Sequence, residues 1–574
     1  MVVNTIDITL PNYGTIRGSV DIRRQIAIFR NVPFAHAPVR WRVAVKPQRW
    51  TGIRDATIQG PVPPHIPTDN LQIDLIPKEY TTIGTSTNSL HQFGVEHSEE
   101  GGLNSNIFVP LSALQEGAAS VPVLAFIYGG SYRTGSNAFP LYDARNFVEH
   151  SVQLGQPIIV VVPNYRMAAF GFLASKELQQ DIDQHIQQSP TPIPAYDQSI
   201  GNWGLQDQKL AFEWIRENIS EFGGDAKNVT AFGQSVGAIS LHYHIVLPAH
   251  HGLFDRAILQ SGAIGTMSTG TVEQVGQPIF DRLVEILGIP ADLSGVEKVR
   301  RLREVPVEEL TRASDEAGPR FGYRPFHDGG KIFPFNIPVE TWADSSFSYD
   351  PNLKAVLIGA NKEEGYSLDN DFGERTLKTW PHLLNSFVPS PELVPLYEVA
   401  YGTPQVDEDV SKIMAEHLGD IVFHYPIERA VDALIQVKQA RGDAFSLERY
   451  HFEIPTQATL NSHPSSGSMH GGELLFLFNP PMNETVFTPS ELSAALEVQK
   501  RWISFAYRQP VLSDEGKATR AERDEAIVFT KEYKVEVGKG RRLSEKVMGL
   551  WDAALEVRLK DIQASLDASV PKEE

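Results

Sequence analysis

The sequence of 574 residues contains no cysteine. This absence excludes disulfide bonds, thiolate nucleophiles, zinc-thiolate sites and iron-sulfur clusters, so the protein needs no oxidising compartment. Long hydrophobic runs are also missing, because segments such as 121–127 and 157–163 are far shorter than the roughly 20 residues that cross a bilayer. The first ten residues lack the basic and apolar regions of a signal peptide. These absences predict a cytoplasmic protein with no membrane partner.

Positive charge is scarce as well. The chain has 51 Lys and Arg against 71 Asp and Glu, a formal net charge of -20, and like charge repels nucleic acids and anionic lipids. We therefore expect no nucleic-acid partner. Hydrophobic residues make up 41% and charged residues 21%, which is typical of an ordered globular protein with a large core. Large α/β enzymes often form one unit of this length, and we expect a single domain over residues 1–574.

The most informative stretch runs from Asn228 to Ala238 and contains the pattern G-x-S-x-G around Ser235. An apolar run ends at Gly233, and a segment compatible with a helix follows Gly237. Strand, sharp turn and helix form the context of a nucleophile elbow, which exposes the serine hydroxyl and places the next amide, that of Val236, at a helix N-terminus. The alternative is a buried strand followed by an ordinary serine turn.

Strands and helices alternate along the rest of the chain. Continuous apolar runs are typical of strands covered on both faces of a parallel sheet, and they occur at residues 121–128, 157–162, 256–259 and 353–358. The pattern predicts a doubly wound, mostly parallel α/β sheet. Residues 270–345 and 370–440 have helical periodicity and are expected to form excursions over the carboxyl edge, where ligands bind. Residues 58–98 read as a long irregular loop, a candidate entrance to the site.

A serine nucleophile needs a base, and the base needs an orienting carboxylate. In α/β-hydrolases these partners follow the serine in the order acid, then histidine. Downstream of Ser235, the apolar run of residues 356–360 is followed by the acids Glu363 and Glu364, and His470 lies in a glycine-rich loop. Upstream, residues 125–128 are followed by small residues whose amides could form the second half of an oxyanion hole.

Five further segments complete a recognisable set: Gly201 to Gln208, Phe222 to Asp225, Asn164 to Arg166, Gly252 to Phe254, and Ser261 with Gly262. Together with the elbow, these segments make the chain resemble the type-B carboxylesterases and cholinesterase-like α/β-hydrolases over nearly its whole length. The resemblance implies the α/β-hydrolase fold and cleavage of small-molecule carboxylic esters through an acyl-serine intermediate. It implies neither a cofactor nor a metal.

The resemblance also implies roles for individual residues. Ser235 would be the nucleophile, His470 the base and Glu364 the acid. The amides of Gly130, Ser131 and Val236 would form the oxyanion hole. Ser261 would support the triad from behind.

Three departures from the family pattern bear on the substrate. Ser131 stands where the family has a third glycine, so its side chain narrows the expected site. Gln234 stands where cholinesterases carry a glutamate, and no tryptophan occurs between Trp50 and Trp203 to supply an aromatic platform for a quaternary ammonium. We therefore expect an uncharged substrate other than a choline ester. The Pro- and Gln-containing stretch over residues 174–200 has no role that the sequence assigns.

Two other interpretations stay open at this point. An acyltransferase or lactone-forming enzyme would use the same residues with an alcohol in place of water. A non-catalytic adhesion or scaffolding protein would share the fold, although such members tend to lose the triad.

Overall fold

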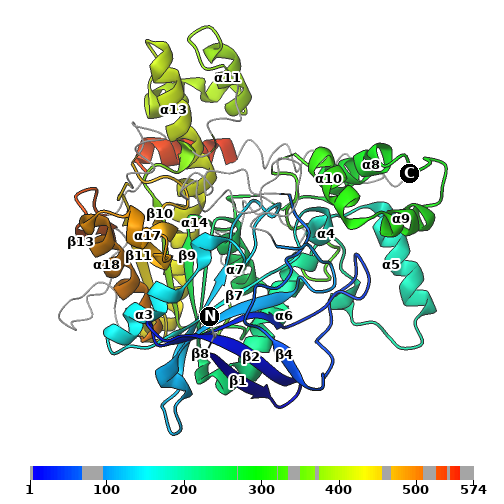
Figure 1. Cartoon of the computed structure of the whole chain (residues 1–574). Helices are drawn as coiled ribbons and strands as arrows, with labels where there is room; N and C mark the ends of the chain where they lie inside the picture. The colour runs from blue at the N-terminus through cyan, green and yellow to red at the C-terminus, as the bar shows by residue number, and fades with distance from the viewer. Residues whose placement is uncertain are drawn as a thin grey trace.

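A long mixed sheet runs through the molecule (Figure 1). The computed structural model describes residues 4–66, 95–267, 269–319, 321–333, 349–366, 368, 374–455, 467–508, 525–539 and 543–555. In spatial order the strands are β1 (Thr5–Leu10), β2 (Gly14–Asp21), β3 (Ile26–Pro33), β5 (Asn104–Pro110), β7 (Ile159–Pro163), β6 (Val121–Ile127), β8 (Gly224–Gln234), β9 (Arg256–Gln260), β10 (Ala355–Asn361), β11 (Ser446–Phe452), β12 (Glu525–Phe529) and β13 (Val535–Lys539). A short strand, β4 (Ile53–Asp55), pairs with β2.

The centre of the sheet is parallel and both edges are antiparallel. The parallel block runs from β7 to β12, whereas β1, β2, β3 and β5 pair antiparallel, as does β13 with β12. Strands β6, β7, β9 and β10 are buried along their whole length, as continuous apolar runs require in a sheet covered on both faces. The predicted doubly wound, mostly parallel sheet is confirmed.

Helices cover both faces of this sheet (Figure 1). The helices in the body of the molecule are α3 (Arg145–Gln153), α4 (Ala168–Phe172), α6 (Trp203–Asn218), α7 (Val236–Val246), α14 (Tyr425–Arg441), α16 (Glu473–Phe478), α17 (Asn483–Val486) and α18 (Pro489–Ala506), whereas α5 (Lys176–Gln188) lies away from the sheet and contacts the helix over residues 295–304. Helices α3, α16 and α18 contact one another, while α6 and α7 contact β8 and α14 contacts β10 and β11.

The two predicted excursions form projections in Figure 1, one at the right and one at the top. The first contains α8 (Gln277–Ile286), α9 (Gly295–Glu304) and α10 (Val307–Ala317), and the second contains α11 (Trp380–Phe387), α12 (Val394–Tyr401) and α13 (Asp407–Gly419). The second projection has a hydrophobic cluster of its own, in which Trp380, Tyr397 and Met414 pack with Leu550 and Trp551. The last two belong to a helix over residues 545–555, called the C-terminal helix below.

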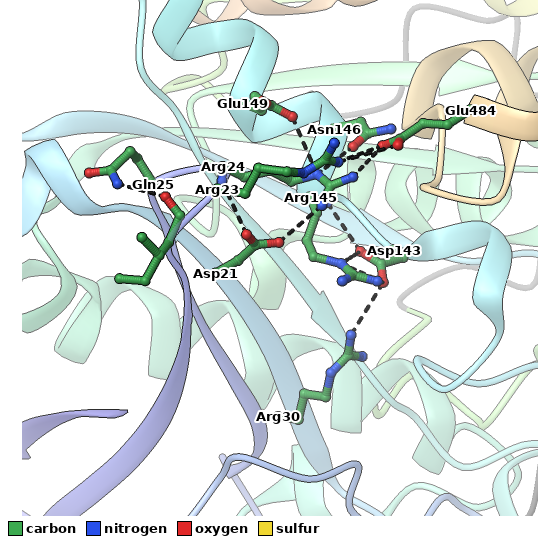
Figure 2. A network of polar contacts seen from close by, with 11 residues as sticks. Asp21, Arg23, Arg24, Gln25, Arg30, Asp143, Arg145, Asn146, Glu149 and Glu484 are labelled. Carbon is green, nitrogen blue, oxygen red and sulfur yellow. Dashed lines mark hydrogen bonds and ion pairs between the residues drawn. The ribbon is translucent and has the colours of Figure 1, made fainter. Parts of the chain in front are cut away.

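A partly buried ionic network joins the antiparallel edge to the helices (Figure 2). Arg24, in the turn after β2, pairs with Glu484 of α17. Arg30 of β3 donates to Asp143 at 3.3 Å, and Asp143 also accepts from Arg145 of α3 at 2.7 Å. Buried charges are tolerated only when they are paired in this way. The network therefore holds the β2–β3 turn against α3 and α17.

Candidate functional site

Ser235 lies in the sharp turn between β8 and α7, with φ 56° and ψ -126°. This left-handed backbone is rare for a residue with a side chain. A Cβ on Gly237 would lie 1.9 Å from the carbonyl oxygen of Ile127, and one on Gly233 would lie 2.7 Å from the backbone of Gly237. Only glycine fits at either position, so strand and helix can approach closely enough to expose Ser235. The predicted elbow is therefore present.

Glu364 and His470 meet, although 106 residues separate them. Glu364 follows β10 and is fully buried, and His470 lies in the loop before α16. The distance from His470 Nδ1 to Glu364 Oε2 is 2.5 Å. The other carboxylate oxygen, Oε1, accepts from the backbone amide of Asn361 at 2.7 Å. This carboxylate is thus held on both oxygens and oriented toward the imidazole.

The other ring nitrogen of His470 lies 3.1 Å from Nε2 of Gln234, the residue before the elbow serine. An amide nitrogen is only a donor, so Nε2 of the imidazole accepts and its single proton lies on Nδ1, shared with Glu364. The Phe423 ring covers the imidazole at 4.4 Å between centroids. In the described structure the Nε2 lone pair that could take the serine proton therefore accepts a hydrogen bond from Gln234.

The backbone of residues 130–132, which follow β6 and are called the strip below, has an unusual conformation. Gly130 has φ 110°, Ser131 has φ 57° and Tyr132 has φ 57°. A Cβ on Gly130 would lie 2.0 Å from the carbonyl oxygen of Thr134, so this position also requires glycine. Ser131 borders the same cavity as Ser235 and Val236. The amide of Val236 belongs to the first turn of α7 and has no acceptor within the helix.

A cavity of about 540 Å³ lies over Ser235. Most of its wall is apolar, with residues from the segment after β9, from the second excursion and from the C-terminal helix: Ile264, Met267, Phe387, Leu418, Ile421, Phe423, Ala430 and Trp551. Burial lowers the pKa of the lining residues His242 and His417 to about 3, so both are neutral. The charged side chains on the wall are Arg324 and Arg429, and no carboxylate occurs among the described lining residues. The size and polarity suit a small, mainly apolar ligand.

Gln234 and Ser261, both singled out from the sequence, lie next to the site. Gln234 contacts His470, as described above. Ser261 follows β9 with φ 52°, and its amide donates to the carbonyl oxygen of Gly359 at 2.9 Å. Its side chain lies beside the hydroxyl of Tyr450.

Glu473 is a buried acid that the sequence analysis missed. It accepts from Gln260 Nε2 at 3.3 Å and from the side-chain amide of Asn361. Burial and the neighbouring Glu364 raise its pKa to about 7. A signal was present in the sequence, because a charged residue stands directly before the apolar run 474–478, where burial was expected.

We expect Glu473→Gln to remove a pH-dependent loss of stability. The carboxyl has an ordinary pKa of 4.5 when unfolded and about 7 when folded, so the unfolded chain ionises first as the pH rises. This difference lowers the wild-type free energy of unfolding by up to about 3 kcal/mol above pH 7, whereas glutamine contributes no such change. Denaturant unfolding at pH 5 and pH 8 measures it. The free energy of unfolding of the variant, relative to that of the wild type, should be higher at pH 8 than at pH 5. An equal difference at both pH values would contradict the raised pKa of Glu473.

Comparison with known proteins identifies the family. The sequence model described as "Carboxylesterase family" matches residues 4–515. The chain belongs to the carboxylesterase family. This membership confirms the resemblance and the α/β-hydrolase fold class inferred from the sequence.

Three relatives of this chain are named as esterases. Para-nitrobenzyl esterase of Bacillus subtilis (strain 168) is 30% identical over 372 residues, 63% of this chain and 64% of that protein. Fumonisin B1 esterase of Sphingopyxis macrogoltabida is 27% identical over 553 residues, 92% of this chain and 87% of that protein. Cholinesterase of Mus musculus is 27% identical over 424 residues, 70% of this chain and 63% of that protein. The first and third matches therefore span less than two thirds of the relative.

Some predictions concern residues outside the described part of the chain. Residues 67–94 of the expected entrance loop are among them. The stretch over residues 174–200 is described and forms α5 and a short 3-10 helix, Ala195–Gln198. Among the described residues, no helix is long and apolar enough to cross a membrane.

Proposed function

We propose that this carboxylesterase hydrolyses carboxylic esters of small molecules through an acyl-serine intermediate. The observation that carries the proposal is the contact between Glu364 and His470, whose other ring nitrogen lies at Gln234, the residue directly before Ser235. Family membership and the esterase names of two relatives support the same chemistry.

In the proposed mechanism, His470 Nε2 leaves Gln234 and takes the hydroxyl proton of Ser235 as the oxygen attacks the ester carbonyl. Glu364 holds the imidazole and stabilises the positive charge it gains. The amides of Gly130, Ser131 and Val236 bind the oxyanion of the tetrahedral intermediate, each worth roughly 3 to 4 kcal/mol. His470 then protonates the leaving alcohol, and water activated by the same imidazole releases the acid.

An organophosphonate ester tests the nucleophile directly. A p-nitrophenyl phosphonate should release one equivalent of p-nitrophenol and leave its phosphonyl group on Ser235, where peptide mass spectrometry locates it. An adduct on a different serine, or none, would overturn the proposal. Product analysis of an ester in water with added alcohol separates hydrolysis from acyl transfer.

The proposed substrates are uncharged esters. Gln234 offers an amide where a carboxylate would attract a cation, and the charges on the described cavity wall are those of Arg324 and Arg429. Both features disfavour a quaternary ammonium group. The predicted cytoplasmic location remains a proposal from the sequence alone.

We expect Gln234→Glu to favour choline esters. A carboxylate at this position would attract the ammonium by about 2 kcal/mol at an effective dielectric constant near 20, so the preference should rise roughly tenfold after solvent screening. The measurement is the kcat/KM ratio of butyrylcholine to 3,3-dimethylbutyl butyrate, which cancels any general loss of activity. Gln234→Leu is the uncharged control and should leave the ratio unchanged. A wild-type preference for the choline ester above tenfold would refute the substrate assignment.

A further inference from the structure

A continuous line of buried polar groups runs along α7, from the strip after β6 to the segment before α6. We call it the α7 polar chain, and its members are Tyr132, Ser240, Gln208, His244, His250 and Tyr196. All except Tyr196 are buried, and Tyr196 is half-buried at the outer end. The proposed mechanism uses none of these side chains.

The inner half of the α7 polar chain connects three elements. Tyr132 Oη lies 3.0 Å from Ser240 Oγ on α7. Gln208 of α6 donates from Nε2 to the same serine oxygen at 3.3 Å, and its Oε1 lies 3.0 Å from His244 Nε2. The strip, α6 and α7 are therefore joined through side chains.

The outer half reaches the surface through two histidines. Nδ1 of His244 lies 2.5 Å from Nδ1 of His250, and Nε2 of His250 lies 2.8 Å from Tyr196 Oη. Burial lowers the pKa of His244 to about 3 and that of His250 well below its usual range, so both rings are neutral. Two neutral imidazoles that meet through Nδ1 share one proton between them.

These contacts give the chain a direction. Because Gln208 Oε1 can only accept, His244 Nε2 donates, and His244 Nδ1 must accept from His250. His250 Nε2 then accepts from the hydroxyl of Tyr196. At the other end Ser240 accepts from Gln208, and in its bond with Tyr132 either hydroxyl can be the donor. Every donor from Tyr196 to Gln208 thus points toward Ser240.

The strip needs such support because its backbone is strained. Ser131 and Tyr132 both have φ 57°, and left-handed backbone on residues with side chains persists only where the surroundings hold it. Tyr132 is held in three ways: its carbonyl accepts from Ala168 at 2.7 Å, its ring packs on Phe172 at 4.5 Å, and its hydroxyl bonds Ser240. Only the last of these contacts reaches the helix that begins beside Ser235.

We propose that Tyr132 and Ser240 are positioning residues of the oxyanion hole. Their bond joins the strip that carries the Ser131 amide to the helix that carries the Val236 amide, and so sets the separation of the two halves. Gln208 and the histidine pair keep Ser240 oriented for this bond and anchor it to Tyr196, which gives the stretch over residues 174–200 a role. The inference rests on the proposed function of Ser131 and Val236.

Tyr132→Phe and Ser240→Ala test the inference, since each removes one hydroxyl and little else. Because small displacements of oxyanion donors weaken transition-state binding, kcat for p-nitrophenyl butyrate should fall about tenfold in either variant. KM should stay within twofold. The affinity of a trifluoromethyl ketone, whose adduct places an oxyanion in the hole, should fall in parallel with kcat. The double variant should be no worse than either single one, because both remove the same bond.

Tyr507→Phe is the matched control. Its hydroxyl donates to the carbonyl oxygen of Pro157 at 2.7 Å, outside the chain, and its loss should leave kcat and ketone affinity unchanged. If Ser235 still accepts a phosphonate but Tyr132→Phe and Ser240→Ala keep kcat and ketone affinity within twofold of the wild type, the positioning role is wrong and the proposed function stands. If Ser235 accepts no phosphonate, the proposed function fails first.

Discussion

Ser235→Ala should abolish turnover of p-nitrophenyl butyrate, lowering kcat by about 10⁴-fold or more, as loss of a serine nucleophile does in other hydrolases. The expectation follows from the elbow, where Ser235 borders the cavity beside the Ser131 and Val236 positions. Alanine adds no atoms to the turn, so the melting temperature should stay within a few degrees. Steady-state kinetics and thermal unfolding of the same preparation measure both effects.

A second serine on the cavity wall provides the control. Ser386 lines the same cavity, but its hydroxyl donates to the carbonyl oxygen of Leu383 at 2.7 Å within α11. Ser386→Ala should therefore keep kcat within about threefold, the range of an ordinary surface hydroxyl. Residual activity of Ser235→Ala within tenfold of the wild type would refute the assignment of the nucleophile.

Glu364→Gln should lower kcat by about 10⁴-fold through the wrong histidine tautomer, the effect known for the equivalent change in a serine-protease triad. The Asn361 amide donates to one side-chain oxygen of residue 364 and would hold the carbonyl oxygen of the glutamine there. The NH₂ group would then face His470 Nδ1 and donate to it. This forces the imidazole proton onto Nε2, where no lone pair remains for the proton of Ser235.

The adjacent acid provides a control that tests the choice of residue. Glu363 accepts from the backbone amide of Gly467, and the glutamine oxygen of Glu363→Gln could accept the same bond. This variant should lose less than tenfold in kcat because it leaves the tautomer unchanged. If Glu363→Gln were the more damaging change, the acid would be misassigned. Measurement of kcat at several pH values would show that the loss of activity in Glu364→Gln does not come from a shift of the pH optimum.

Much of the fold was predictable because its signals are local. Continuous apolar runs indicated buried parallel strands, and the helical period indicated both excursions. The three strands at the carboxyl end, β11 to β13, were not predicted. Strand β11 carries charged residues among its buried positions, Glu448 and Arg449, which hide it from a search for apolar runs. The order of the strands in the sheet could not be predicted either, because strands that pair can be distant in the sequence.

The sequence by itself determined the elbow, since the steric demand of Gly233 and Gly237 acts between near neighbours, and it placed Ser235, Glu364 and His470 in the order that the family requires. Only the tertiary structure decided that Glu364 meets the imidazole, that Gln234 holds its other nitrogen, and that Glu473 lies buried beside them. The reason is physical. Turn geometry depends on residues adjacent in the chain, whereas the distance between side chains more than a hundred residues apart depends on how the whole sheet and its helices pack.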